Sequence, residues 1–509
     1  MQLRSLGHAG IEIRSNGSRI LCDPWFSPEG AFQASWFQYP DNSFLLDDEL
    51  LSPTAIFISH EHMDHVDPWF LGRVPAEVPV YIPRYASRVL PKKVLSARQR
   101  PLIELEQWEL EEVLPGVKLM FVSEESPMNH DSVMVVSANG KSLLNMNDAR
   151  LSAAQIRSIK NEVGGTIDVL ALQGAGASWF PMCYEYPQER MAELAVQKRL
   201  AKLRYVARMV QAAKPEACLP FAGPPVFLDD ELRVYNDQLG PEGIFPDQRQ
   251  VVDWLATQGL QSELFLTGDT WDVATKERRT GTDASFFDDP TYIQRYAERK
   301  AQEIETVRSR HPEPSEDLWP AFDEYFGTVL RMSKYFNERI DMRVGFDLIG
   351  PGGGRWAVDF RPGQQGVFST LGDCQYLYTF ETRWLPPILE EKVPWEDFFL
   401  SLRFHAWRHP DVYNDHLLGL LKFAQREPLK AVEDYETAPD RNETIDVHVG
   451  EVTYRIQRFC PHAGQDLRET AELLPGGIIR CLGHHYEFDL ATGQCVNGQA
   501  KPLRTERLT

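Results

Sequence analysis

Residues 54–68 read TAIFISHEHMDHVDP and join a strand-like segment to a cluster of histidines. The branched, apolar residues at the start predict a buried strand that opens into a loop. That loop carries His60, His62, Asp64 and His65. Histidines two apart on an extended loop can face one metal, while an aspartate and the histidine next to it reach a second. Because histidines rarely cluster without a role in ligation or catalysis, the stretch predicts a two-metal site and not a polar surface.

A hairpin that ends in an aspartate is predicted on each side of this stretch. The first reads GIEIRSNGSRILCDP, with a turn at Asn16-Gly17, and ends at Asp23. The second reads DSVMVVSANGKSLLNMND, with a turn at Asn139-Gly140, and ends at Asp148. Asn-Gly between alternating apolar residues is a strong hairpin signal. Hairpins that alternate with crossover units suggest sheets covered by helices.

A second ligand pattern lies near the C-terminus, where Cys460-x-His462 is followed after eighteen residues by Cys481-x-x-His484. Two thiolates on one iron and two imidazoles on the other are the Rieske ligation of a [2Fe-2S] cluster. A structural zinc site is the alternative, but the order of cysteines and histidines reverses that of a zinc finger. We interpret His485 as a neighbour of the cluster. Cys495 lacks the partner that a disulfide over the cluster needs.

Composition limits the kind of protein. The 509 residues suggest about three domains, and 53 basic against 74 acidic residues give a net charge of −21, which disfavours nucleic acid and anionic membranes as partners. The sequence contains no long apolar run and its first residues lack the pattern of a secretory signal, so we expect a cytoplasmic protein. Seven scattered cysteines argue against a disulfide framework.

The H-x-H-x-D-H loop resembles the signature of the metallo-β-lactamase superfamily. The resemblance implies an αββα sandwich whose further ligands follow later strands, here His130 or Asp131, and Asp148 as a bridging carboxylate. It also places Asp23 close to the metals, with His8 either behind a ligand or in a turn. The superfamily's last histidine ligand is missing from LPFAGPPVF at residues 219–227, so either Asp229 replaces it or a coordination position stays open.

The organisation we predict is multidomain α+β. Residues 1–280 form the metallo-β-lactamase-like catalytic domain, 281–315 a helical linker, 316–440 an α+β domain that resembles sterol-carrier folds, and 441–509 an all-β Rieske domain. Within the third region, residues 395–424 are expected to be helical and GPGGGRW to be a turn.

A Rieske cluster transfers single electrons and needs a redox-active acceptor, which zinc cannot be. We therefore assign one or two non-haem irons to the first cluster. The same pair of modules occurs in the CMP-N-acetylneuraminate hydroxylase family, which the chain resembles at ISHEHMDH, LNMNDAR, GASWFP and PFAG, although there the Rieske module is N-terminal. The resemblance implies hydroxylation with dioxygen and an external electron donor, such as a ferredoxin, a flavin reductase or a cytochrome b5-like protein.

The expected function is thus a Rieske-coupled monooxygenase acting on a small, nucleotide- or carrier-linked substrate, with His60, His62, Asp64, His65 and Asp148 as its catalytic residues. A metal-dependent hydrolase with a redox-sensing Rieske domain, or a reductase of dioxygen or nitric oxide, is the alternative. Residues 187–214 predict a helix with a basic face, which is more simply solvated than substrate-binding. If a substrate does bind nearby, the candidate residues are Trp179, Phe180, Tyr184, Arg204 and Arg208. A homo-oligomer is plausible.

Overall fold

In the computed structural model the chain forms two compact units. The first comprises Met1–Glu124, His130–Met182 and Tyr186–Arg310, and the second Glu125–Asn129, Cys183–Glu185 and His311–Thr509. The structure does not describe the following residues: Ala177, Pro241, Val412, His462, Ala463, 483–485, Gly498, Gln499 and Thr509. It also leaves out the side chain of Asp440, and it describes all other residues. Among the described helices, none combines the length and the apolar character needed to cross a membrane.

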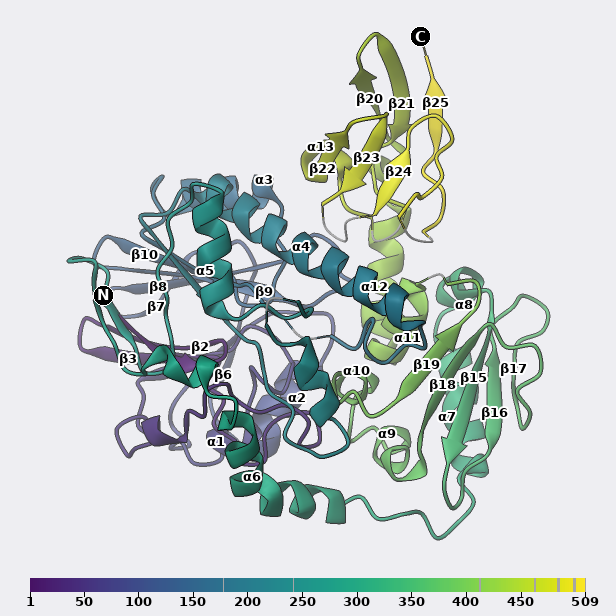
Figure 1. Cartoon of the computed structure of the whole chain (residues 1–509), viewed down its shortest axis with the longest axis horizontal. Helices are drawn as coiled ribbons and strands as arrows, with labels where there is room; N and C mark the ends of the chain where they lie inside the picture. Colours follow the sequence, from purple (N-terminus) through teal and green to yellow (C-terminus); the bar gives the residue numbers. More distant parts are fainter. Residues whose placement is uncertain are drawn as a thin grey trace. The chain divides into compact units, whose positions relative to one another are not determined.

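Two mixed sheets form the centre of the first unit (Figure 1). The eight-stranded sheet has the order β14 (Glu277–Arg279), β13 (Thr270–Asp272), β1 (Gln2–Gly7), β2 (Gly10–Ser15), β3 (Ser18–Cys22), β4 (Ala55–Phe57), β5 (Val80–Pro83) and β6 (Leu102–Leu105). The six-stranded sheet has the order β12 (Ala217–Phe221), β11 (Val169–Gln173), β10 (Lys141–Asn145), β9 (Ser132–Ala138), β8 (Val117–Ser123) and β7 (Glu111–Leu114). Both predicted hairpins are confirmed, because β2 pairs with β3 and β9 with β10 across Asn-Gly turns that have positive φ at both residues.

The first unit has four layers, helices, sheet, sheet and helices, because both faces of each sheet are apolar. Phe57 of β4 lies in the core between the sheets, whereas Ile56 on its other face packs beneath helices α1 (Pro68–Leu71) and α2 (Val89–Ala97). The outer face of the second sheet is covered by α3 (Ala153–Glu162), α4 (Gln188–Ala213) and α5 (Gln248–Thr257). Burial of β4 on both faces accounts for its continuous apolar run. The predicted αββα sandwich is confirmed.

Helix α6 (Tyr292–Ser309) occupies most of the predicted linker. Its buried residues Tyr296, Ala297 and Val307 pack with Phe37 and Val226 in one apolar cluster. The helix therefore belongs to the first unit, which extends to Arg310, and does not act as a free spacer. Besides the α-helices, the described residues form five short 3-10 helices: Ser43–Leu45, Arg233–Gln238, Ala284–Asp288, Thr382–Trp384 and Pro439–Asn442.

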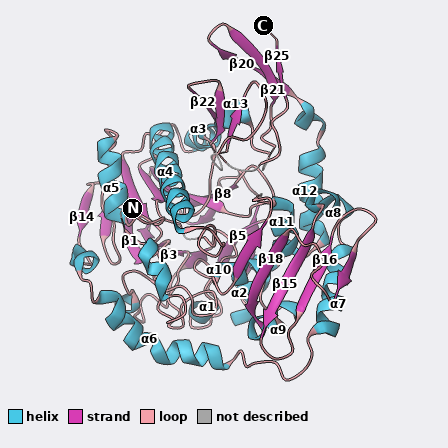
Figure 2. Ribbon diagram, turned by 45° about the vertical axis from the view of Figure 1, so that its right-hand side comes forward, coloured by secondary structure: helices cyan, strands magenta, loops and turns pink. Residues whose placement is uncertain are grey.

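A five-stranded sheet with helices forms the first part of the second unit (Figure 2). The strand order is β17 (Gly366–Phe368), β16 (Arg355–Asp359), β15 (Arg343–Ile349), β18 (Tyr376–Glu381) and β19 (His405–Arg408). The helices are α7 (Trp319–Leu330), α8 (Lys334–Ile340), α9 (Pro386–Leu389), α10 (Trp395–Leu400), α11 (Asp415–Phe423) and α12 (Arg426–Thr437). This α+β character was predicted; the likeness to sterol-carrier folds stays a prediction.

The expectation of continuous helix over residues 395–424 is wrong in its middle. Helix α10 ends at Leu400, and Leu402 then adopts a positive φ of 58°. The following strand β19 pairs antiparallel with β18, with Ala406 opposite Tyr378. Its alternation of exposed His405, buried Ala406 and exposed Trp407 is the period of a strand.

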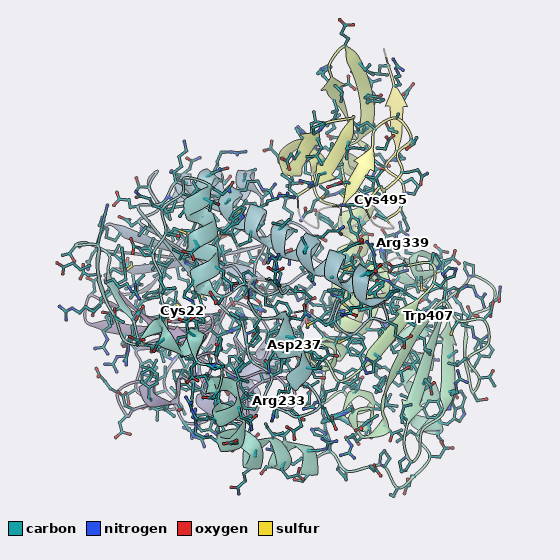
Figure 3. All side chains as sticks on the ribbon, viewed as in Figure 1. Cys22, Arg233, Asp237, Arg339, Trp407 and Cys495 are labelled. Atoms are coloured by element: carbon teal, nitrogen blue, oxygen red, sulfur yellow. The ribbon has the colours of Figure 1, made fainter. Side chains whose placement is uncertain are left out.

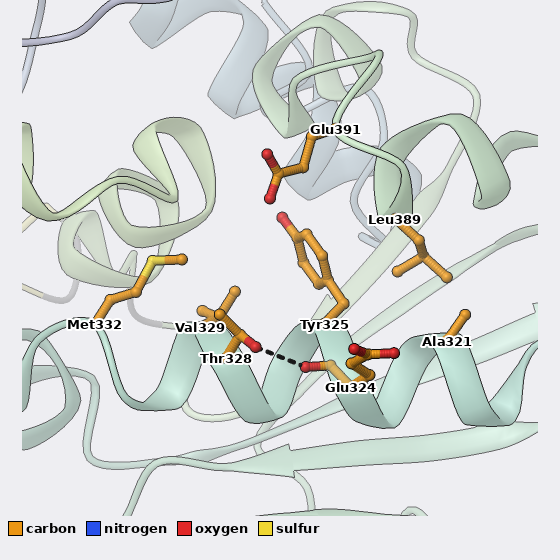
Figure 4. Close-up of a pocket in the computed structure, with 8 residues that line it drawn as sticks. All are labelled: Ala321, Glu324, Tyr325, Thr328, Val329, Met332, Leu389 and Glu391. Carbon is orange, nitrogen blue, oxygen red and sulfur yellow. Dashed lines mark hydrogen bonds between the residues drawn. The ribbon is translucent and has the colours of Figure 1, made fainter.

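A pocket of about 250 Å³ opens on α7 (Figure 4). Its lining consists of Ala321, Glu324, Tyr325, Thr328, Val329, Met332, Leu389 and Glu391. These residues come from α7 and from the region of α9, and none was among the predicted site residues.

The C-terminal part of the second unit is built from two three-stranded sheets. One contains β20 (Thr444–Val449), β21 (Val452–Gln457) and β25 (Thr505–Arg507), and the other β22 (Ala471–Leu474), β23 (Ile478–Cys481) and β24 (Glu487–Asp489). Helix α13 (Leu467–Thr470) is a single turn. Ile456, Ile479, Phe488 and Leu490 form the core together with Cys460 and Cys481. The predicted β domain is confirmed.

Candidate metal centres

Four of the predicted metal ligands, His60, His62, Asp64 and His65, lie at the carboxyl end of β4, in the loop that leads to α1. Asp67 holds this loop in place. Its carboxylate accepts hydrogen bonds from the backbone amides of Phe26 (2.8 Å), Ser27 (2.7 Å) and Phe70 (3.2 Å), the last of which caps α1. These bonds fix the end of the loop that leads into α1.

The structure brings the ligand candidates together in three overlapping groups. They are His60, His62 and Asp131; then His60, His65 and Asp148; then His8, Asp64 and His65. Within each group, the possible ligand atoms lie within 4.8 Å of one another. Since neighbouring groups share His60 or His65, the donors form one continuous cluster that has room for adjacent metals.

Residues behind the ligands orient the imidazole rings. Asp23 Oδ2 lies 2.9 Å from His65 Nδ1, so that ring donates to the carboxylate and turns Nε2 toward the cluster. The Ser59 hydroxyl donates to Asp23 over 2.6 Å and lies 2.8 Å from His60 Nδ1. It therefore accepts from His60, whose Nε2 is left as the metal donor. The predicted closeness of Asp23 to the metal site is confirmed by these contacts.

Electrostatics favour the charged forms of the carboxylates. Burial raises the pKa of Asp64, but the charges of His65 and His8 outweigh it and hold that pKa well below its usual value. Burial also raises the pKa of Asp148, but the charge of His65 outweighs this effect and holds that pKa below its usual value. Conversely, burial lowers the pKa of His65, while Asp148 and Asp64 raise it well above the ordinary value. The cluster thus presents anionic oxygens to a cation even in its buried setting.

The imidazole nitrogens and carboxylate oxygens of this cluster fit the ligand requirements of a metal ion. Among the described residues, Asp64 Oδ1 and His65 Nε2 are buried and have no hydrogen bond of acceptable geometry. Buried polar atoms without partners are costly unless a ligand satisfies them. Three imidazoles with three carboxylates form a set that iron binds as well as zinc does. His60, His62, Asp64, His65, Asp131 and Asp148 could therefore hold one or two metal ions.

His130 and Asp131 were both candidates, and they take different places. Asp131 Oδ1 lies 4.0 Å from His60 Nε2. His130 stacks on Tyr85 with 4.6 Å between ring centroids, and its Nδ1 lies 3.3 Å from Glu61 Oε1. Among the described residues, no metal-binding group includes His130 or Asp229. The structure therefore places Asp131, and not His130, beside His60 and His62.

The residues suggested for substrate binding are dispersed. Tyr184 is buried in the second unit, where its hydroxyl contacts that of Tyr376. Arg204 is exposed on α4, and Arg208 is half-buried. Trp179 and Phe180 lie in the loop after β11, where the Lys198 amine donates to Ser178 Oγ (2.9 Å) and to the carbonyl of Phe180. Their role in binding stays a prediction.

Lys202, one of the predicted basic residues of α4, also belongs to this neighbourhood, although it was not among the predicted binding residues. Its amine donates to the carbonyls of Ala175 and Gly176. Burial and the charge of Lys198 lower the pKa of Lys202 well below its usual value. A signal existed, because Lys202 follows Lys198 by one helical turn and so shares its face of α4.

The cysteines of the second centre lie in the C-terminal domain. Cys460 and Cys481 are 4% and 1% exposed, and the Sγ of Cys481 lies 3.6 Å from Gln465 Oε1, which links the two cysteine loops. Their predicted partners His462 and His484, like His485, lie outside the described residues. All seven cysteines are described, including Cys22 and Cys495 in Figure 3, and none forms a disulfide.

Comparisons with known proteins agree with this division. Residues 18–207 match the Beta-lactamase superfamily domain, and residues 442–505 match the Rieske [2Fe-2S] domain. The chain is 30% identical to a protein of Mycolicibacterium smegmatis named "Putative Rieske 2Fe-2S iron-sulfur protein", over 100% of both chains. The chain belongs to this family of Rieske iron-sulfur proteins.

Two further proteins are similar to about half of this Rieske protein. It is 25% identical to the cytidine monophosphate-N-acetylneuraminic acid hydroxylase of Danio rerio, over 43% of this chain and 38% of that protein. CmlA, a diiron beta-hydroxylase from Streptomyces venezuelae, superposes with a TM-score of 0.35 at 17% identity, over 55% of this chain and 53% of that one.

Proposed function

We propose that the protein is an iron-dependent oxygenase that hydroxylates or oxidises a small substrate with O2 and with electrons passed on by its Rieske domain. The observation that carries this proposal is the presence, in one chain, of a Rieske domain and of a buried cluster of imidazoles and carboxylates. A one-electron carrier needs an acceptor that can change its oxidation state. Zinc cannot do so, which favours iron at the first cluster.

The protein's own residues would prepare that site. His60 and His62 with Asp131 could hold one iron and Asp64 with His65 a second, and Asp148, which is grouped with His60 and His65, could serve as a ligand of both. Iron, when bound, would supply the redox chemistry for O2 activation. Asp23 and Ser59 keep the Nδ1 atoms of His65 and His60 protonated, so that neither ring can rotate away from the cluster.

The substrate we propose is small and linked to a nucleotide or to another anionic carrier. The Danio rerio relative is a hydroxylase of a cytidine monophosphate conjugate, and the basic helix α4 offers cations nearby. Arg204 and Arg208 of α4, with Trp179, Phe180 and Tyr184, are the proposed binding residues. An external donor such as a ferredoxin, a flavin reductase or a cytochrome b5-like protein would charge the Rieske cluster, in the cytoplasm, and the protein could act as a homo-oligomer.

The decisive experiment is metal and sulfide analysis of anaerobically purified protein, with electron paramagnetic resonance before and after reduction by dithionite. About three or four irons per two sulfides, with a reduced Rieske signal, would support the oxygenase. About two irons per two sulfides with stoichiometric zinc would contradict it. In that case hydrolysis of esters, amides or phosphodiesters becomes the activity to test, with the Rieske domain as a redox sensor.

A further inference from the structure

We infer that His8 is a metal ligand that replaces the histidine missing from residues 219–227. It would bind the metal held by Asp64 and His65. This inference rests on the metal centre of the proposed function and adds a residue that lies outside the matched Beta-lactamase superfamily domain, residues 18–207.

The side chains of His8, Asp64 and His65 lie close enough together to share one metal ion. His8 Nε2 lies 2.9 Å from Asp64 Oδ2, and the donor atoms of His8, Asp64 and His65 all lie within 4.8 Å of one another. His8 is 7% exposed. Among the described residues, its Nε2 is a buried atom without a well-aligned hydrogen bond, just as His65 Nε2 and Asp64 Oδ1 are. Possible ligand atoms this close together on three buried side chains are an arrangement that a cation satisfies.

The backbone of His8 gives an independent indication. His8 lies in the turn between β1 and β2 with a φ of 42°, which is the left-handed region. Residues other than glycine are uncommon there, and asparagine, aspartate and histidine are the ones found most often. The Trp25 ring meets the imidazole edge-on, with 5.3 Å between centroids, and fixes its direction. A histidine that served only to make the turn would be better replaced by glycine or asparagine.

The segment after β12 explains why the usual ligand is absent. The amide of Ala222 donates to the carbonyl of His8 over 2.9 Å, so this segment lies directly against the turn. A Cβ at Gly223 would lie 3.7 Å from Cε1 of His8, and the φ of Gly223 is 106°. A side chain at this glycine would therefore be strained by its backbone conformation, and its Cβ would also lie 3.3 Å from that of Ala175. Position 223 is thus unfavourable for a ligand histidine, whereas His8 lies beside it.

The test is the iron content of the full-length His8→Asn protein after dialysis against a chelator. Asparagine is the matched change because it tolerates the left-handed conformation but offers no imidazole. We expect a loss of about one iron per chain with the two sulfides retained, and the same loss in Asp64→Asn. Full iron content in His8→Asn, with the loss only in Asp64→Asn, would overturn the inference.

Two measurements keep the test decisive. A urea-unfolding midpoint close to that of the wild-type first unit shows that the variant is folded around position 8. If His8→Asn does not fold, His8→Gly is used, because glycine adopts the turn without strain; iron that returns when imidazole is added supports ligation, and full iron before imidazole contradicts it. Wild-type protein with only the cluster's own irons would instead refute the proposed function, so the two failures are distinguishable.

Discussion

Asp131 and His130 are neighbours in the chain, but their side chains reach different partners. Asp131 belongs to the group with His60 and His62, whereas His130 contacts Glu61 and Tyr85. We predict that Asp131→Asn lowers the iron bound outside the Rieske cluster, because an amide is a weaker ligand than a carboxylate. His130→Asn is the matched control and should keep that iron. Equal losses in both variants, measured as iron per sulfide, would contradict this assignment.

Asp67 gives a prediction about pH. Burial raises its pKa to about 6, although amide donors from Phe26, Phe70 and Ser27 act in the opposite direction. Since the folded pKa lies above the unfolded value of about 3.8, protonated Asp67 stabilises the fold, and this contribution disappears as the pH rises through about 6. Asp67→Asn cannot ionise. Its urea-unfolding midpoint relative to wild type should therefore increase from pH 4 to pH 7, and a constant difference would refute the prediction.

At the scale of elements, helix α4 connects packing with the loop after β11. The buried side of α4 carries Lys202, which donates to the carbonyls of Ala175 and Gly176, whereas Arg204 is exposed on the same helix. We predict that Lys202→Met lowers the free energy of unfolding by about 1–3 kcal/mol, because two buried carbonyls lose their donor.

Arg204→Met is the matched control on α4. It should change the free energy of unfolding by less than about 0.5 kcal/mol, as exposed substitutions usually do. Chemical denaturation of the two variants in parallel decides the matter. A Lys202→Met protein as stable as Arg204→Met would show that the amine does not support the loop. If Arg204→Met also lowers substrate turnover, Arg204 is a binding residue as proposed.

At the scale of the molecule, the two metal centres belong to different compact units, with the first cluster in one unit and Cys460 and Cys481 in the other. Each unit has its own apolar core. We predict that Cys481→Ser abolishes the reduced Rieske signal and lowers acid-labile sulfide, because the cluster loses a thiolate ligand. The iron of the first cluster should remain, as measured by metal analysis. Loss of all iron together would show that the centres depend on each other for assembly.

Short-range patterns in the sequence were enough to predict much of this protein. The H-x-H-x-D-H loop, both Asn-Gly hairpins and the Rieske ligand pattern consist of residue types at fixed local spacings, whereas the sandwich was implied by the family resemblance that the loop carries. A strand's apolar run and a hairpin's turn are properties of a few consecutive residues, so the chain displays them directly. Strand β19 was missed because pairing with β18, a long-range contact, decided its conformation.

Only the tertiary structure decided which distant side chains meet. It placed His8 beside Asp64, chose Asp131 over His130, and turned Lys202 inward while Arg204 stays exposed. It also packed α6 onto the first unit in place of a free linker. The physical reason is the same in each case: local spacing limits where a side chain can point, but burial and backbone strain, set by packing across the sheets, select among the remaining positions.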